Sequence, residues 1–149
     1  MAVERPNKNP YSAFNFIVEI DGVQVAAFQE VSGLDSENTP IEYREGADPM
    51  NTVRKLPGSE KYPNAVFKRG ITGTLDLYNF RKEVRDGGTA FPPTHTLTVQ
   101  LLDEQHRPVY KWTLINAWCA KLTGPSLNAK GNEIAIESME WAHDRIDIS

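Results

Sequence analysis

Cysteine is almost absent from this 149-residue chain, in which Cys119 is the single example. An intrachain disulfide is therefore excluded, and so is a small secreted domain held together by several disulfides. Trp118 and Ala120 flank Cys119, which fits the usual behaviour of free cysteine as a small buried hydrophobic residue. We expect synthesis and assembly in the cytoplasm, where thiols stay reduced.

Long apolar runs and an excess of one charge are also missing. No apolar run approaches the roughly 18 residues that a membrane-spanning helix needs. The N-terminus, MAVERPNKNP, lacks the apolar segment of a signal peptide or anchor, so no stable membrane insertion is expected. The formal net charge is −4, and basic and acidic residues are divided evenly between the two halves. The basic surface typical of nucleic-acid binders is therefore not indicated.

Local motifs for catalysis and metal binding are missing as well. The three histidines, His95, His106 and His143, are far apart, and no His-x-x-His or Cys-x-x-Cys spacing exists. The Gly-x-Ser-x-Gly motif and the glycine-rich phosphate loop are also absent. We therefore expect a protein that is not an enzyme and that uses no cofactor or metal.

Alternating apolar residues are abundant and predict strands. Residues 14–20 alternate and are followed by Asp21-Gly22, which favours a tight two-residue hairpin turn. Residues 95–102 alternate cleanly, and residues 109–122 predict one long strand or two strands joined by a kink at Asn116. Further strands are predicted at 41–44, 64–69 and 133–142.

One segment has the helical period instead. Leu77, Phe80 and Val84 form one stripe of a helix predicted over residues 74–86, with Thr74 as the N-cap. The chain is therefore expected to be a single domain, residues 1–149, and mainly β. The predicted architecture is an antiparallel β-sandwich or barrel with one crossing α-helix and a long extended arm.

The predicted arm is residues 44–63, REGADPMNTVRKLPGSEKYP, which show neither the helical nor the strand period. A segment of this length without structure is uncommon inside a compact domain and is usually functional or disordered. Fixing this segment in one conformation costs conformational entropy, and one small domain offers few contacts to offset that cost. If the segment lies over a neighbouring molecule, its apolar residues can anchor it. Near Ala26-Ala27 and near Ser138, the apolar residues switch from one face of the predicted strand to the other. This switch indicates strands that are covered on both faces.

Several motifs follow one another in a characteristic order: PYSAFNFIVEIDG, AAFQEVSGL, EYREG, VRKLPG, FKRGIT, LYNFRKEV and NEIAIESMEWAHD. From Pro10 to Asp144 the chain resembles the tube proteins of contractile tails. This family includes phage tail tube proteins, inner tube proteins of extracellular contractile injection systems and, distantly, the type VI secretion tube protein.

The resemblance implies a structural role without catalysis. Six copies would close into a ring by pairing strand edges, and rings would stack into a hollow tube that a contracting sheath drives through a target envelope. Sheath, baseplate and cap proteins are the implied partners, and protein effector or DNA is the implied transient cargo. The particle would be a phage tail or a released injection system, and the sequence leaves this choice open.

Two sets of residues are implicated in assembly. The resemblance implies that the arm contacts the next ring through Arg44, Glu45, Asp48, Met50, Val53, Arg54, Lys55, Leu56, Glu60, Lys61 and Tyr62. Polar positions that alternate with core residues are candidates for the lumen or the outer wall: Asn15, Glu19, Gln24, Thr96, Thr98 and Gln100.

Two alternative functions remain. The first is a monomeric ligand-binding β-barrel with a pocket lined by Phe14, Phe16, Trp112 and Trp118. The second is a hydrolase that acts through a carboxylate or histidine.

Overall fold

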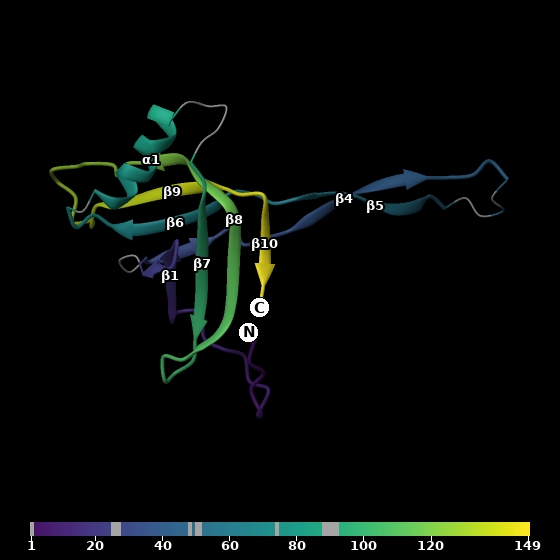
Figure 1. The fold of residues 1–149 in the computed structure, drawn as a ribbon, viewed down its shortest axis with the longest axis horizontal. Coiled ribbons are helices and arrows are strands. Elements are labelled where there is room, and N and C mark those ends of the chain that lie inside the picture. Colours follow the sequence, from purple (N-terminus) through teal and green to yellow (C-terminus); the bar gives the residue numbers. More distant parts are fainter. Residues whose placement is uncertain (1, 25–27, 48, 50–51, 74, 88–92) are drawn as a thin grey trace.

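The computed structural model describes residues 2–24, 28–47, 49, 52–73, 75–87 and 93–149. Within these ranges the chain forms ten strands and one helix (Figure 1). The elements are β1 (Phe16–Ile20), β2 (Val23–Gln24), β3 (Glu30–Ser32), β4 (Glu37–Tyr43), β5 (Arg54–Lys61), β6 (Ala65–Gly70), α1 (Asp76–Gly87), β7 (His95–Leu102), β8 (Pro108–Thr123), β9 (Ile136–Ala142) and β10 (Arg145–Ile148). The mainly β architecture with one helix is as predicted.

The strands form one eight-stranded antiparallel sheet and a separate two-stranded one. In the large sheet the order is β2-β1-β7-β8-β9-β6-β3, and β10 also pairs with β8. The turn between β1 and β2 is the predicted one, because Asp21 and Gly22 both have positive φ angles, of 52° and 82°. Ile20 and Val23 are direct partners across it, as the two-residue type I′ turn requires.

Strand β8 bends at Asn116 and thereby joins two differently oriented parts of the sheet. Asn116 has a φ angle of 53°, and the ladder with β7 is irregular at this point. Before the bend β8 pairs with β7 and β10, and after it β8 pairs with β9 and keeps one partner on β7, His95 opposite Ala117. Figure 1 shows β7, β8 and β10 running across β6 and β9. The kink predicted at Asn116 is therefore confirmed.

The hydrophobic core lies between these two parts of the sheet. One part contributes Val18, Ile20, Leu97, Val99 and Leu114, and the other contributes Ala65, Phe67, Ala117, Cys119, Met139 and Trp141. The alternation in residues 95–102 is confirmed at Leu97 and Val99, which are buried. At Leu102 an irregularity in the ladder shifts the phase, so Leu102 is buried while Leu101 is half-buried.

Helix α1 packs against β8 and continues the core on one side. Leu77 and Val84 are buried, and Phe80 packs partly against the core, so the predicted apolar stripe is confirmed. The predicted N-cap, Thr74, lies outside the described residues, as does the phase change at Ala26-Ala27. No helix in the described ranges is long and apolar enough to cross a membrane.

Outside residues 37–61, three parts of the chain differ from the strands predicted. The last long strand begins at Ile136 rather than residue 133, which leaves Ile134 outside it and exposed. Phe14 lies before β1 and is 75% exposed, although it continues the alternation of that strand. Strand β10 follows β9 after a short turn and was missed, because a four-residue strand carries too little pattern to recognise.

Cys119 is only 1% exposed, and burial raises the pKa of its thiol to about 11. We predict that the native protein reacts very slowly with a bulky thiol reagent at pH 8, because the thiolate is scarce and covered. Cys119→Ser should lower the free energy of unfolding by about 1–3 kcal/mol, because it buries a more polar group. Labelling of the native protein with the reagent tests the first prediction, and denaturant unfolding of the variant tests the second. Fast labelling of the native protein would contradict the burial of Cys119.

Candidate assembly surfaces

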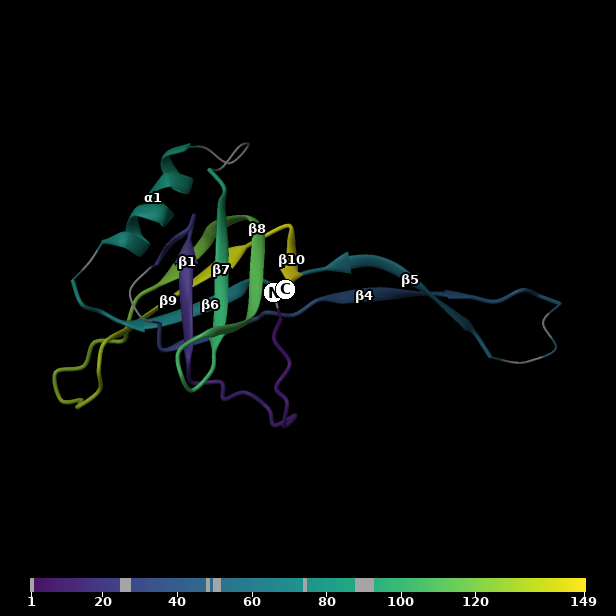
Figure 2. The same ribbon diagram turned by 60° about the horizontal axis from the view of Figure 1, so that its bottom comes forward.

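Strands β4 and β5 form a hairpin that projects far from the rest of the molecule (Figures 1 and 2). The two strands pair antiparallel from Glu37 opposite Lys61 to Tyr43 opposite Arg54, with one irregularity in register between Asn38 and Pro40. The arm is therefore a β-ribbon that begins at Glu37, and the prediction that residues 54–61 lack strand structure was wrong. The alternation is missing because both faces of the ribbon are largely exposed, so neither face has to be apolar.

One face of the arm nevertheless carries exposed apolar side chains. Ile41 and Leu56 are cross-strand partners, and they are 54% and 48% exposed. Tyr43 extends the same face toward the tip, where it lies opposite Arg54, and is also exposed. The opposite face carries the charged pair of Glu42 and Lys55. The arm thus displays hydrophobic side chains that nothing in its own chain covers within the described residues.

The predicted contact residues are spread over most of this ribbon. Those on β5 are Arg54, Lys55, Leu56, Glu60 and Lys61, with Tyr62 directly after it, while Arg44, Glu45 and Val53 flank the tip. Asp48 and Met50 lie outside the described residues. The Tyr43 hydroxyl donates to Glu45, at 3.1 Å, and the Tyr62 hydroxyl donates to Glu60, at 3.2 Å. Strand β4 was left out of the predicted set, although Ile41 lies in it.

The root of the arm is fixed by a histidine. The Nε2 atom of His143 lies 3.1 Å from the Pro63 carbonyl oxygen, and its ring lies 5.8 Å from that of Tyr62. Burial lowers the pKa of His143, so the neutral imidazole donates this hydrogen bond at neutral pH. The contact ties the end of β5 to the end of β9.

The predicted lumen or wall residues share one face of the sheet. Glu19 is the register partner of both Gln24 and Thr98, and Gln100 lies opposite Ile17. By alternation Asn15 and Thr96 mark the two ends of this face, which points away from the core. The full set is Asn15, Glu19, Gln24, Thr96, Thr98 and Gln100.

The same polar face extends onto strands that the prediction did not include. Lys111 and Thr113 are the partners of Gln100 and Thr98, and Asp147 lies opposite Thr113. The alternation of Tyr110, Trp112 and Leu114 with Lys111 and Thr113 is visible in the sequence and could have identified these two positions.

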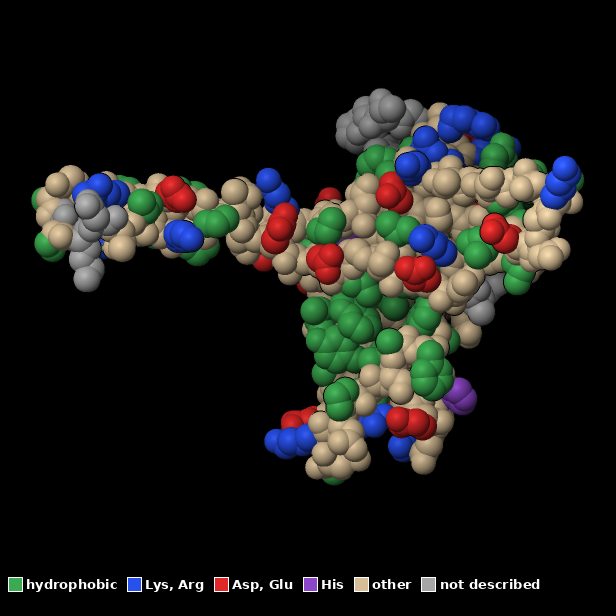
Figure 3. All heavy atoms as spheres, turned by 180° about the vertical axis from the view of Figure 1, so that it is seen from behind, with side chains coloured by type: hydrophobic (Ala, Val, Ile, Leu, Met, Phe, Trp, Pro, Cys, Tyr) green, Lys and Arg blue, Asp and Glu red, His purple; other side chains and the backbone are tan. Residues whose placement is uncertain are grey.

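The opposite face of the sheet is only partly covered, which leaves an apolar groove. Its volume is about 400 Å³, and it is lined mainly by Phe16, Val31, Leu34, Val99, Leu101 and Trp112. Figure 3 shows hydrophobic side chains gathered on the body of the molecule beneath the base of the arm. The groove brings Phe16 and Trp112 together, as the ligand-pocket alternative requires. It does not include the other two aromatic residues of that alternative, Phe14 and Trp118.

Comparison with known proteins identifies the family. The family model described as T4-like virus tail tube protein gp19 matches residues 12–147. The chain belongs to this tail tube protein family. It is accordingly a structural tube subunit, and nearly the whole chain takes part in the match. The predicted resemblance is confirmed.

Solved structures of similar proteins agree with this assignment. A chain in the extended sheath–tube complex of PVC, an extracellular contractile injection system, is 26% identical, with a TM-score of 0.83. The match covers 94% of this chain and 91% of that one. A chain in the tube-terminating cap of the anti-feeding prophage, AFP, is 29% identical, with a TM-score of 0.84 and coverage of 100% and 94%.

More distant structures share the fold alone. Hcp1 from Flavobacterium johnsoniae is 9% identical, with a TM-score of 0.55 and coverage of 91% and 94%. No curated protein sequence matches the chain.

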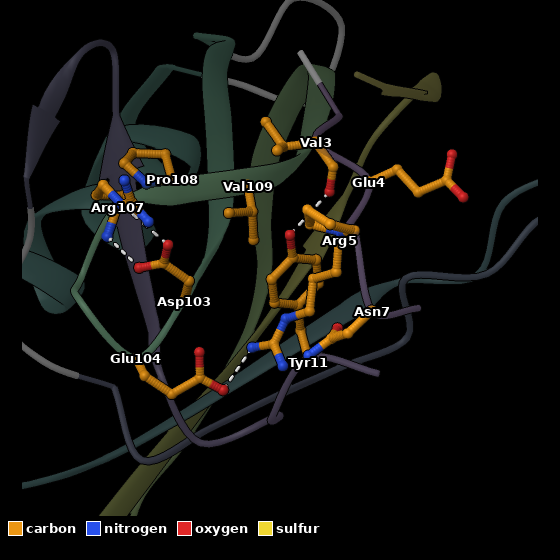
Figure 4. A pocket seen from close by; sticks show the side chains of 11 residues that line it. Val3, Glu4, Arg5, Asn7, Tyr11, Asp103, Glu104, Arg107, Pro108 and Val109 are labelled. Carbon is orange, nitrogen blue, oxygen red and sulfur yellow. Dashed lines mark hydrogen bonds and ion pairs between the residues drawn. The ribbon is translucent and has the colours of Figure 1, made fainter. Parts of the chain in front are cut away.

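The N-terminal segment of this tail tube protein borders a second hollow, of about 500 Å³ (Figure 4). Arg5 pairs with Glu104 and lies 4.1 Å from the ring centre of Tyr11, whose hydroxyl donates to the Val3 carbonyl at 2.9 Å. The bond from Arg5 lowers the pKa of Glu104. These groups satisfy one another, so the hollow is best explained as the place where the N-terminal segment is anchored to the β7–β8 turn.

Within the described ranges, no group of three or more His, Cys, Asp or Glu side chains is placed to hold a metal ion. The three histidines of this tail tube protein lie in separate surroundings: His95 beside α1, His106 in the β7–β8 turn and His143 at the root of the arm.

Gly58 allows the two strands of the arm to approach closely at an irregularity in their register. A β-carbon on Gly58 would lie 2.2 Å from the Thr39 carbonyl oxygen, whereas one on Gly46 would meet nothing within 4 Å. We predict that Gly58→Ala loosens the arm and that Gly46→Ala, near the tip, does not. Amide hydrogen exchange of residues 37–61 would measure this, with residues 95–123 as an internal reference; equal protection in both variants would contradict the prediction.

Proposed function

We propose that this protein assembles into rings of six identical copies and that the rings stack into the hollow inner tube of a contractile tail or injection system. The observation that carries the proposal is the arm, a ribbon with exposed apolar side chains on one face that reaches away from its own subunit. Such a surface is stabilised when another molecule covers it. Family membership and the similarity to chains of PVC and AFP support the same function.

Ring closure would pair the free edges of the sheet. Strands β2 and β3 end the path of the large sheet, and β10 pairs only with β8 among the described residues. Free edges of this kind invite pairing with other chains. A closed ring of identical subunits removes all such edges at once, because each copy supplies both partners.

Stacking would place the arm of one copy in the apolar groove of another. Ile41, Tyr43 and Leu56 would contact the groove around Leu101 and Trp112. The arm extends away from the body that carries its own groove (Figures 1 and 2), so a second copy is the partner that supplies both surfaces. Exposed ion pairs each contribute only about 0–1 kcal/mol, so the apolar contacts should dominate this junction. Several arms engaged together then strengthen it without any new contact.

The polar face of the sheet would line the lumen. Glu19 and Asp147 supply negative charge to this face, and Lys111 and Arg145 supply positive charge. Charges of both signs, interspersed with threonine, leave no large field of one sign that would hold a passing polymer. We infer that this face lets protein or DNA cargo slide through without stable binding.

The remaining partners follow from the assembly. The similar chains come from sheath–tube, cap and baseplate structures, and we propose corresponding sheath, cap and baseplate partners for this protein. Its role would be mechanical and without catalysis. Subunits would assemble in the cytoplasm and then become part of a phage tail or an extracellular injection particle.

The arm provides the first test. We predict that replacing residues 40–57, which lie between the register partners Asn38 and Glu60, with a short Gly-Ser linker leaves a soluble, folded subunit that no longer stacks into tubes, because the distal arm is lost. Negative-stain microscopy and sedimentation would measure assembly, and circular dichroism would measure folding. A second version of this test compares two double variants. One combines Ile41→Ser with Leu56→Ser, and the other combines Glu42→Ser with Lys55→Ser on the opposite face. Long tubes formed by the deletion variant would show that the arm does not join rings.

The groove provides the second test through two adjacent residues of β7. Leu101 lines the groove and Gln100 lies on the opposite, polar face. We predict that Leu101→Lys prevents stacking, because it places a charge where the arm docks, whereas Gln100→Lys still forms tubes. Thermal unfolding of the two variants controls for folding. A folded Leu101→Lys protein that assembles normally, or a wild type that stays monomeric and binds a small apolar ligand, would overturn this assignment.

A further inference from the structure

His95, the first residue of β7, lies between two carboxylates that come from different parts of the chain. Its Nδ1 atom is 2.5 Å from the Asp21 carboxylate, in the β1–β2 turn. Its Nε2 atom is 2.8 Å from the Glu83 carboxylate, on α1. The side chain of His95 is 15% exposed. One imidazole ring thus connects a hairpin turn, a strand and the only helix of the described chain.

This arrangement requires a charged imidazole. A neutral ring has one N–H, so one of the two carboxylates would face a nitrogen lone pair, whereas the protonated ring donates to both. Hydrogen bonds between charged partners are also the stronger kind. Burial of the ring opposes its charge, but Asp21 and Glu83 outweigh burial and raise the pKa of His95 above its ordinary value of 6.5. The pKa of Asp21 is lowered, although burial opposes this, because His95 and the Thr96 N–H donate to its carboxylate.

The other groups around His95 are apolar. The ring meets the edges of Phe80 on α1 and Trp141 on β9, with centres 5.0 and 6.1 Å apart, and Ala117 is its partner on β8. Asp76, at the start of α1, lines a neighbouring hollow together with Asp21. Among the described residues, Asp21 and Glu83 are therefore the two charged groups that contact His95.

Among the described residues, one further polar contact joins α1 to the sheet in this region. The Arg81 guanidinium donates to the Cys119 carbonyl oxygen at 3.3 Å. This bond is longer than the two made by His95, and it does not involve the imidazole ring. The protonation state of His95 is therefore what changes with pH in these polar contacts between α1 and the sheet.

We propose that protonated His95 is a pH-dependent latch that holds α1 and the β1–β2 turn against the sheet, and that its deprotonation loosens α1. The latch acts within one subunit, so it stands independently of ring formation and stacking. Its contribution to stability is fully present below pH 6.5, the value expected for the unfolded chain, and is lost as the pH rises through the higher value of the folded state.

Hydrogen–deuterium exchange measured by mass spectrometry tests the latch in the full-length protein. Exchange at the ring carbon Cε1 reports the titration of each histidine, and backbone amide exchange reports the opening of α1. We expect His95 to titrate above pH 6.5 and at a higher pH than His143, whose pKa is lowered by burial. Corrected for the intrinsic rate, protection of residues 76–87 should fall by up to about tenfold per pH unit above pH 6.5, the limit for one linked proton.

Three variants make this test specific. In Glu83→Gln the His95 midpoint should fall and α1 should be less protected at pH 6, whereas Asp86→Asn, with the same charge change on α1, should have little effect on either. In His95→Gln the protection of α1 should no longer depend on pH in this range. If His95→Gln does not fold, the wild type and Glu83→Gln still test whether His95 acts as a latch. A His95 midpoint at or below pH 6.5, or protection of wild-type α1 that does not change with pH, would overturn the latch.

Discussion

The fold depends on the bend of β8 at Asn116. A regular strand of this length would keep all its partners in one continuous, twisted sheet. A residue in the left-handed region turns the chain instead, so the two parts of β8 run in different directions. The Asn116 side chain donates to Asp144, at 2.9 Å, and the Asp144 N–H donates to the Ile115 carbonyl, at 3.0 Å. These bonds fix the corner where β9 ends and β10 begins. The core is enclosed because the two parts of the sheet face each other across this corner.

Partial closure also produces the surfaces proposed for assembly. Phe16, Leu101 and Trp112 alternate in step with core residues, yet they lie where the second part of the sheet does not reach. The uncovered end of the core face is the groove. Among the described residues, β2 and β3 at the two ends of the sheet each pair with a single strand, as β10 does. A subunit folded in this way is stable around its core and is left with apolar and backbone surfaces that other copies can complete.

The sequence predicted the parts of the fold in which burial differs between two faces. Leu97 and Val99 alternate with threonine and lie in the core, and Leu77, Phe80 and Val84 mark the buried side of α1. Backbone signals were equally direct at Asp21-Gly22 and Asn116. The ribbon of β4 and β5 could not be predicted in this way, because an element exposed on both faces has no hydrophobic period. Its prolines, Pro40 and Pro57, lie opposite each other and also argued against a strand; both are tolerated because the outer edges of the ribbon are free.

The candidate surfaces were predictable to different extents. The polar face follows from alternation alone, so all six of its predicted members lie together. The groove does not, because the residues that line it have the same pattern as the buried ones, and only the three-dimensional arrangement shows which of them stay uncovered. The carboxylates around His95 are 74 and 12 residues away in sequence, a separation that no local motif can reveal.

The two-stranded nature of the arm has a consequence for how a finished particle would behave. A lone hairpin is at best marginally stable in water, because it has too few partners to hold its shape. In a tube built as proposed, each arm would gain its rigidity from the copy on which it lies. The arms of the last ring would have no neighbouring copy to lie on and would remain flexible. The open end of the tube would therefore come apart more easily than its middle, and a terminating cap would stabilise that end by binding those arms.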